Sequence, residues 1–243
     1  MHSGRWTGEG VFMLRLEDLD IRKGSFCLSG TASIGAADSV AVIGPSGAGK
    51  STLLEAIAGF QPLHAGQVLW RGEDLTAHRP GQRPVAMLFQ DGNLFPHLTV
   101  RQNAGLGIDP NRKLRPKERQ TVEEAIARVG LGGLEERKPA ELSGGQQSRA
   151  ALARVLVQRR DILLLDEPFA ALGPALKAEM LDLVKEITSE NGVTLLMVSH
   201  DPDDARRIAD QVILIAEGQL YPPAPTHALL DNPPPALRGY LGA

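Results

Sequence analysis

Hydrophobic and polar positions follow two different repeats along this chain of 243 residues. Residues 14–20 alternate with a period of two, as expected of a strand with one buried face. Residues 40–43, 162–165 and 193–198 are instead continuous apolar runs, which predict strands that are buried on both faces. Amphipathic stretches separate these runs. This alternation is typical of an α/β fold, in which crossover helices join parallel strands.

Three stretches carry the apolar spacing of a helix. Residues 53–58 place four apolar side chains on one face, and residues 176–187 form a second apolar face with Pro174 in the first turn. Strand signals vanish between residues 99 and 141, where apolar residues recur at i, i+3, i+4 and i+7. These are Val122, Ala125, Ile126 and Val129. We therefore expect a helical subdomain, about residues 91–160, inserted into the α/β core.

The two ends of the chain differ from its body. Residues 1–12 show little apolar periodicity and no signal-peptide segment, which predicts a disordered extension before a folded part at residues 13–243. Prolines become frequent from residue 222 onward and predict short surface elements there.

Composition and charge exclude several classes of protein. The chain has 26 Lys and Arg against 29 Asp and Glu, a formal net charge of −3, so we expect no nucleic-acid partner. Its apolar runs are far shorter than the roughly 18 residues that a membrane span requires. The single cysteine, Cys27, excludes an intrachain disulfide and fits a reducing compartment.

A glycine-rich loop follows the apolar run at residues 40–43 and precedes a predicted helix. Its spacing, G-x-x-x-x-G-K-[ST], is that of a phosphate-binding loop. Glycines let backbone N–H groups wrap a polyphosphate, Lys50 reaches the β and γ phosphates, and Ser51 ligates magnesium. A glycine-rich turn without a ligand is the alternative, which the strand–loop–helix context disfavours. The loop consists of Gly44, Pro45, Ser46, Gly47, Ala48, Gly49, Lys50, Ser51 and Thr52.

An acidic pair, Asp166 and Glu167, directly follows the apolar run at residues 162–165. The carboxyl end of a buried strand is where α/β folds place their ligands. We expect Asp166 to hold Mg²⁺ through a water molecule and Glu167 to polarise the hydrolytic water. Acidic residues also end strands as solubilising or helix-capping groups, but a neighbouring phosphate loop favours the catalytic interpretation.

The sequence LSGGQ at residues 142–146 precedes another predicted helix, which starts near Gln147. The serine hydroxyl and the glycine N–H groups at a helix N-terminus form a second phosphate-binding cap. We expect Ser143, Gly144, Gly145 and Gln146 to bind the nucleotide.

The motifs GPSGAGKST, LSGGQ and LLLDEP together resemble the ATP-binding subunit of ATP-binding cassette (ABC) transporters, from about residue 13 onward. The resemblance implies a P-loop NTPase core with a mixed or parallel sheet, an inserted helical subdomain and an antiparallel β portion at the N-terminus. It also implies an ATPase that uses ATP and Mg²⁺.

The resemblance further implies roles for single residues. Gln90 matches a glutamine that senses magnesium and the attacking water. The resemblance therefore implies that Glu167, His200 and Gln90 are catalytic residues. It also implies that Ser51, Gln90 and Asp166 form the metal site. His200 matches a histidine that contacts the γ phosphate and orients the water or Glu167. A lone histidine at a strand end is otherwise more often an ordinary surface residue.

The resemblance implies partners as well. The signature residue Ser143 lies on the inserted segment, which implies a head-to-tail homodimer that buries two ATP molecules. Residues 93–99 would face an integral-membrane permease, with a periplasmic solute-binding protein acting indirectly; the alternative role of this segment is a hydrophobic staple. The implied location is peripheral, on the cytoplasmic face of the inner membrane.

Within the family, residues 83–107, 175–181 and 194–210 most resemble the ATPases of thiamine importers. Importers of iron(III), molybdate, sulfate or polyamines are the nearest alternatives. A soluble ABC ATPase that remodels other complexes and a nucleotide switch that does not hydrolyse ATP also stay open.

Two positions depart from the family pattern. Gly173 stands where the family usually has an aspartate, in a loop that crosses the dimer interface, so we expect slower or less coupled turnover. The first predicted strand has no aromatic residue near its end to stack on adenine. Arg22 and Phe26 are the candidates for that contact, and we expect weak discrimination between ATP and GTP.

Overall fold

The computed structural model describes residues 12–90, 92–111, 113–234 and 238. The predicted disordered extension therefore lies outside the described residues, apart from Phe12. That residue begins the first strand, one position before the expected boundary.

The described residues form one sheet of eleven strands in the order β5-β4-β1-β2-β10-β9-β3-β8-β7-β6, with β11 paired to β9. Strands β9, β3, β8, β7 and β6 are parallel to one another, whereas β1, β2, β4 and β5 pair antiparallel. This arrangement confirms the α/β prediction and the antiparallel N-terminal portion. The strands are β1 (Phe12–Lys23), β2 (Phe26–Gly35), β3 (Ser39–Ile43), β4 (Ala65–Trp70), β5 (Glu73–Asp74), β6 (Val85–Leu88), β7 (Ile162–Asp166), β8 (Thr194–Val198), β9 (Gln211–Ala216), β10 (Gln219–Leu220) and β11 (Ala224–Pro225).

Helices occupy most of the segments between the parallel strands. They are α1 (Lys50–Ala58), α2 (Val100–Gly105), α3 (Pro116–Arg128), α4 (Gly144–Leu156), α5 (Pro174–Asn191), α6 (Pro202–Ile208) and α7 (Thr226–Asp231), with 3₁₀ turns at Pro80–Gln82 and Pro139–Glu141. None of the helices in the described ranges is long and apolar enough to cross a bilayer.

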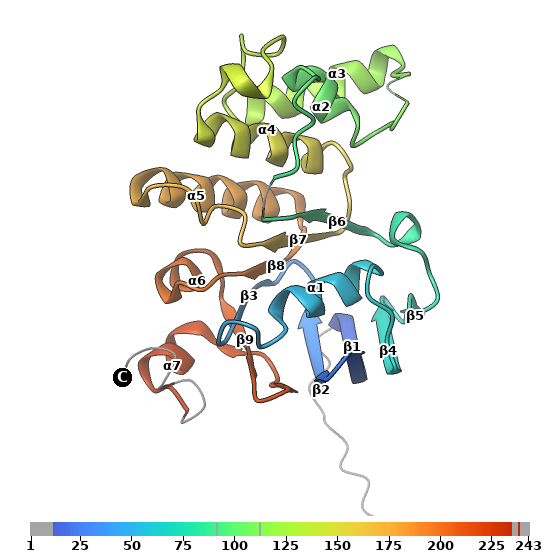
Figure 1. Cartoon of the computed structure of the whole chain (residues 1–243), viewed down its shortest axis with the longest axis vertical. Helices are drawn as coiled ribbons and strands as arrows, with labels where there is room; N and C mark the ends of the chain where they lie inside the picture. The colour runs from blue at the N-terminus through green and yellow to red at the C-terminus, as the bar shows by residue number, and fades with distance from the viewer. Residues whose placement is uncertain (1–11, 91, 112, 235–237, 239–243) are drawn as a thin grey trace, which may run out of the picture.

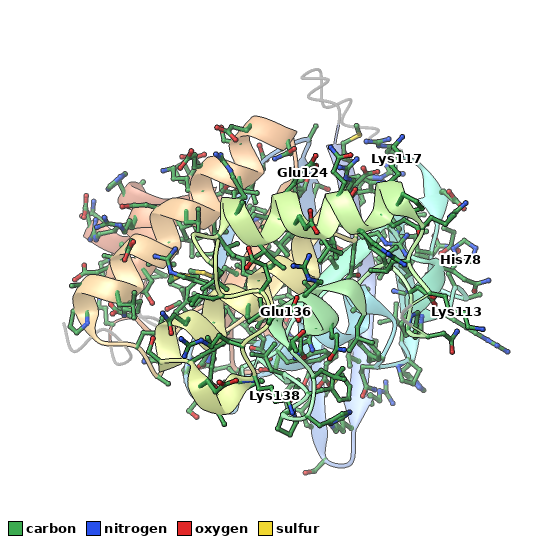
Figure 2. All side chains as sticks on the ribbon, turned by 90° about the horizontal axis from the view of Figure 1, so that it is seen from above. His78, Lys113, Lys117, Glu124, Glu136 and Lys138 are labelled. Carbon is green, nitrogen blue, oxygen red and sulfur yellow. The ribbon has the colours of Figure 1, made fainter. Side chains whose placement is uncertain are left out.

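Helices α2, α3 and α4 gather at one end of the molecule, beyond β6 (Figure 1). On α3 the predicted apolar stripe is buried at Val122 and Ile126, while Lys117 and Glu124 project from the exposed side (Figure 2). The described chain between β6 and β7 is thus helical, as the periodicity indicates. The subdomain boundaries at residues 91 and 160 stay a prediction.

Alternate residues of the parallel strands face two different hydrophobic clusters. In β3, Val40 and Val42 pack with α1 and the antiparallel strands, whereas Ala41 and Ile43 pack with the helices on the opposite face. All four side chains are fully buried. A strand enclosed by two layers needs apolar side chains at every position, which explains the continuous apolar runs in the sequence.

Helix α1 lies inside the cluster shared by the antiparallel and parallel strands (Figure 1), with Leu53, Leu54 and Ile57 fully buried. The last carbonyl groups of any helix lack intrahelical partners, so a buried helix end needs donors from elsewhere. The C-terminal end of α1 obtains them from the N–H groups of Gly59 and Phe60, which donate to Ala56 O and Glu55 O, and from the side chain of Arg83.

The guanidinium of Arg83, only 4% exposed, donates to four backbone carbonyls. Nη1 lies 2.8 Å from both Ala56 O and Ile57 O in the last turn of α1, Nη2 lies 3.1 Å from Thr76 O, and Nε lies 3.1 Å from His78 O. Burial lowers the pKa of Arg83, and the negative charge of Asp74 opposes that change. The negative end of the helix dipole favours a cation at this place, so Arg83 stabilises the helix end.

Replacement of Arg83 with methionine keeps an apolar stem but removes all four donors. We expect the free energy of unfolding to fall by about 2–4 kcal/mol, because hydrogen bonds to a charged group contribute roughly 1.5–3 kcal/mol and the carbonyls stay buried. Urea denaturation of the full chain measures it. Arg79→Met is the matched control, since Arg79 is an exposed arginine of the same segment. Equal unfolding free energies for the two variants would contradict the role of Arg83.

Candidate nucleotide-binding site

Four predicted segments meet at one edge of the parallel sheet. Strands β3, β8, β7 and β6 are neighbours in that order and run parallel, so their carboxyl ends lie side by side. The glycine-rich loop at residues 44–52 follows β3, His200 follows β8, Asp166 and Glu167 end β7, and Gln90 follows β6. The fold therefore brings together residues that are more than 100 positions apart.

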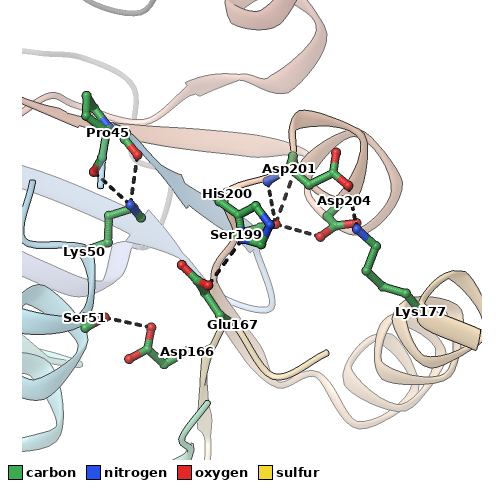
Figure 3. Close-up of polar contacts among 11 residues, drawn as sticks. Pro45, Lys50, Ser51, Asp166, Glu167, Lys177, Ser199, His200, Asp201 and Asp204 are labelled. Carbon is green, nitrogen blue, oxygen red and sulfur yellow. Dashed lines mark hydrogen bonds and ion pairs between the residues drawn. The ribbon is translucent and has the colours of Figure 1, made fainter. Parts of the chain in front are cut away.

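The glycine-rich loop is closed around its own lysine. Lys50 is buried, and its Nζ donates to Gly44 O at 2.9 Å and Pro45 O at 3.0 Å (Figure 3). Burial lowers the pKa of Lys50, and the negative charges of Glu167 and Asp166 oppose that change. Gly44 itself packs against β9, because a Cβ atom at this position would lie 2.0 Å from Ile215 O. The loop is thus shaped by contacts within the chain.

Ser51 and Asp166 form a second contact across the site. Ser51 Oγ donates to Asp166 Oδ1 at 3.0 Å (Figure 3). Burial raises the pKa of Asp166, and the hydrogen bond from Ser51 opposes the rise. A hydroxyl and a carboxylate are oxygen donors of the kind that Mg²⁺ prefers, so this pair fits that ion.

Magnesium sites of enzymes usually take the remaining ligands from phosphates and water. The part of the chain that the structure describes has no group of three or more His, Cys, Asp or Glu side chains able to hold a metal ion. The donor set offered by Ser51 and Asp166 therefore suits a metal that arrives with a nucleotide.

Glu167 has an unusual backbone conformation. Its φ of 45° lies in the left-handed region, which non-glycine residues rarely adopt and which costs roughly 1–3 kcal/mol. Its N–H donates to Val198 O of β8 at 3.2 Å. This turn directs the carboxylate toward the next strand end, where Glu167 Oε2 lies 3.3 Å from His200 Nδ1 (Figure 3). A strained residue that is held this firmly is typical of a functional site.

Gln90 is exposed two residues beyond β6. The four signature residues lie elsewhere: Ser143 is the N-cap of α4, at the helical end of the molecule (Figure 1). Ser143 Oγ accepts from Gln146 N at 3.3 Å, and Gln146 Oε1 accepts from Ser143 N at 3.0 Å. One chain thus brings the phosphate loop, the acidic pair and His200 to one sheet edge, whereas residues 143–146 begin α4, where Gly145 packs against Leu176 of α5.

The structure shows the surroundings of the two positions that depart from the family pattern. Gly173 is the N-cap of α5, and a Cβ atom there would have no atom within 4 Å. Arg22 pairs with Asp20, with Nη2 2.7 Å from Oδ2. The Phe26 ring instead lies against the phosphate loop, because a Cβ at Gly49 would be 2.3 Å from Phe26 Cζ. Of the two candidates for the adenine contact, Phe26 is the one that touches the loop.

A polar cluster next to His200 was missed by reasoning from the sequence. It joins Lys177 of α5 to Ser199, Asp201 and Asp204 around the start of α6 (Figure 3). The acidic residues after His200 were a visible signal. Nothing in the sequence marks Lys177, because it precedes Asp201 by 24 positions on a different helix.

Comparisons with known proteins agree with this arrangement. A family model described as "ABC transporter" matches residues 30–170. The Thiamine import ATP-binding protein ThiQ of Cereibacter sphaeroides is 61% identical over 230 residues, covering 95% of this chain and 100% of that protein. The protein of the same name from Photorhabdus laumondii is 49% identical over 223 residues, covering 92% and 95%.

Solved structures give the same result for the fold. A nucleotide-free ATP-binding cassette from an ABC transporter superposes with a TM-score of 0.83 at 25% identity, covering 92% of this chain and 96% of that chain. The cbiO1 protein of Clostridium perfringens, part of the ABC transporter complex cbiONQ, gives 0.81 at 29% identity, covering 91% of both chains. The resemblance noted in the motifs is thereby confirmed, and the chain belongs to the ABC transporter family as one of its ATP-hydrolysing subunits.

Proposed function

We propose that this chain binds and hydrolyses ATP to energise a thiamine importer. Hydrolysis is supported above all by one observation: the phosphate loop, the Ser51–Asp166 contact and the Glu167–His200 pair all lie at the same edge of the sheet. The choice of thiamine draws on relatives of that name, which align over nearly their whole length.

Each part of the site has a distinct task in this proposal. Residues 44–52 bind the phosphates through backbone N–H groups and the Lys50 ammonium, at the positive end of α1. Ser51 and Asp166, with Gln90 nearby, hold Mg²⁺, which neutralises phosphate charge when it is bound. Glu167 accepts the proton of the attacking water, and His200 orients that water or Glu167 itself.

Two chains complete the site in this proposal. Residues 143–146 of one chain, at the start of α4, cap the phosphates held by the loop of the other chain. A two-fold arrangement of this kind is self-complementary and closed. Phe26, beside the loop, is the residue that we expect to contact adenine.

In this proposal the membrane permease contacts residues 93–99, which lie within the proposed helical subdomain at about residues 91–160. The buried Asn103 side chain holds this segment: Nδ2 donates to Phe95 O, Leu98 O and Thr99 O at 3.1 Å each, and Oδ1 accepts from Phe95 N at 2.8 Å. Phe95 nevertheless stays exposed. An aromatic side chain on a segment fixed in this way suits a protein contact. The chain then lies on the cytoplasmic face of the inner membrane, and a periplasmic binding protein supplies the solute.

The thiamine assignment is tested by uptake. We expect cells that lack this gene but keep the permease and binding protein to lose uptake of labelled thiamine, and the wild-type gene to restore it. Labelled spermidine, molybdate, sulfate and iron(III) serve as controls for the alternative importers. Unchanged thiamine uptake in the deletion, or loss of another solute instead, would exclude the thiamine assignment.

Replacement of Glu167 with glutamine tests hydrolysis. We expect turnover to fall by about 10²–10⁴-fold, the range for loss of a general base, while ATP binding is kept. ATP-loaded Glu167→Gln should then accumulate as a dimer on size-exclusion chromatography. Glu73→Gln, at an exposed glutamate of β5, is the matched control and should behave as wild type. Normal turnover in Glu167→Gln would instead favour a nucleotide switch or a different base.

Replacement of Gly173 with aspartate tests the departure at the dimer interface. The site has room for the side chain, and an aspartate N-cap with less backbone freedom in the unfolded chain should stabilise the protein by about 0.5–1 kcal/mol. We also expect steady-state ATPase to rise, because the carboxylate can contact the partner's phosphate loop. Gly173→Ala separates the two effects, since it restricts the backbone without adding a carboxylate. Equal turnover in Gly173→Asp and Gly173→Ala would contradict a role for a carboxylate at this position in the dimer interface.

A further inference from the structure

One lysine holds the acidic residues that follow His200. Lys177, in the first turn of α5, places Nζ 2.5 Å from Asp201 Oδ2 and 2.7 Å from Asp204 Oδ1 (Figure 3). Asp201 is the N-cap of α6 and accepts from Asp203 N at 3.0 Å. The ammonium therefore bridges the beginnings of two helices.

This position is unfavourable for a lysine on local grounds. A cation in the first turn faces the positive end of its own helix dipole, and the Lys177 side chain is only 19% exposed. Burial opposes the charge, but the hydrogen bonds to Asp201 and Asp204 outweigh it and raise the pKa of Lys177. The bond from Lys177 lowers the pKa of Asp201. The two carboxylates therefore compensate for the local cost of placing an ammonium here.

The second link runs through Ser199. Its hydroxyl donates to Asp204 Oδ2 at 2.7 Å and accepts from Asp201 N at 3.1 Å. Ser199 and Asp204 are both buried. Lys177 therefore contacts Asp201 directly and is linked to Ser199 through Asp204. Ser199 and Asp201 are the two residues that flank His200 in the chain.

The His200 side chain itself is 59% exposed, so the position of its backbone contributes to where the imidazole lies. Its backbone position decides whether Nδ1 reaches Glu167 Oε2, 3.3 Å away. We propose that Lys177 is a positioning residue for ATP hydrolysis, which fixes residues 199–201 through Asp201 and Asp204 so that His200 stays beside Glu167. The inference rests on the roles proposed above for Glu167 and His200.

Lys177→Met tests the proposal in the full chain, because methionine keeps the length of the side chain without its charge. We expect kcat for ATP to fall about tenfold or more, with KM within about twofold, since the change weakens an interaction needed at the reacting centre and not nucleotide binding. Lys177→Arg should recover most of kcat, because a guanidinium can bond both carboxylates. Lys185→Met is the matched control on the same helix, where Nζ donates to a backbone carbonyl of α6, Arg207 O, at 3.1 Å.

A double-mutant cycle separates positioning from a general loss of structure. If Lys177 acts through His200, the variant Lys177→Met/His200→Ala should be no slower than His200→Ala alone. Additive slowing would overturn the inference, and so would a kcat for Lys177→Met equal to that of Lys185→Met. If Lys177→Met does not fold, Asp204→Ala removes the acceptor that Lys177 Nζ and Ser199 Oγ share and decides the question in the same way.

A measurement without turnover distinguishes this inference from the proposed function. The ¹⁵N signals of the His200 imidazole at fixed pH report its contact with Glu167. We expect Lys177→Met to move them toward their positions in Glu167→Gln, and Lys185→Met to leave them unchanged. Unmoved signals in Lys177→Met would overturn the inference. A wild-type chain without ATPase activity would instead overturn the proposed function, while the imidazole signals would still decide where His200 is held.

Discussion

The buried position of helix α1 is the constraint on which the site depends. Its apolar side chains lie between the parallel and antiparallel strands. The unpaired N–H and C=O groups at its two ends therefore need hydrogen-bond partners from the surrounding chain or from a ligand. Arg83 closes the C-terminal end with donors to Ala56 O and Ile57 O. The N-terminal end is left to the glycine-rich loop, where the dipole is positive and the loop residues Pro45, Ser46 and Gly47 are exposed. The same helix dipole thus favours a buried cation at its negative C-terminal end and an anion at its positive N-terminal end.

The sequence indicated those strands whose side chains are all apolar, because burial on both faces leaves no other choice. Strand β2 was not recognised, although Leu28, Ala32 and Ile34 alternate and are buried. Serine, threonine and glycine between them weaken the pattern, and the strand exists because β1 pairs with it along its length. The apolar run of β9 carried a clear signal that was overlooked. The order of the strands in the sheet comes from packing between distant segments, which local patterns do not encode.

The phosphate loop could be predicted because it is one contiguous segment. Ser51 and Asp166 lie 115 positions apart, and the sequence paired them only through the oxygen ligands that magnesium prefers. The left-handed turn at Glu167 could not be predicted, because glutamate has no preference for it, and the bond to Val198 O and the neighbouring strands hold it. The contacts of Lys177 depend likewise on how α5 packs beside α6. Local motifs therefore predict the reacting groups, and tertiary packing decides how these side chains are held.

The capping arrangement at Ser143 suits the proposed role of this residue, which is to bind a phosphate held by a second chain. In the single chain its hydroxyl accepts from Gln146 N at 3.3 Å, at the long end for such a bond. A phosphate oxygen is an acceptor, so the Ser143 hydroxyl can donate its proton to a phosphate while its oxygen still accepts from Gln146 N. Hydrogen bonds to charged groups are roughly twice as strong as neutral ones, which favours that contact. The reciprocal bond from Ser143 N to Gln146 Oε1, at 3.0 Å, does not involve the hydroxyl. This bond holds the first turn of α4 in its capped conformation without a nucleotide. The helix end would therefore need little rearrangement to bind one.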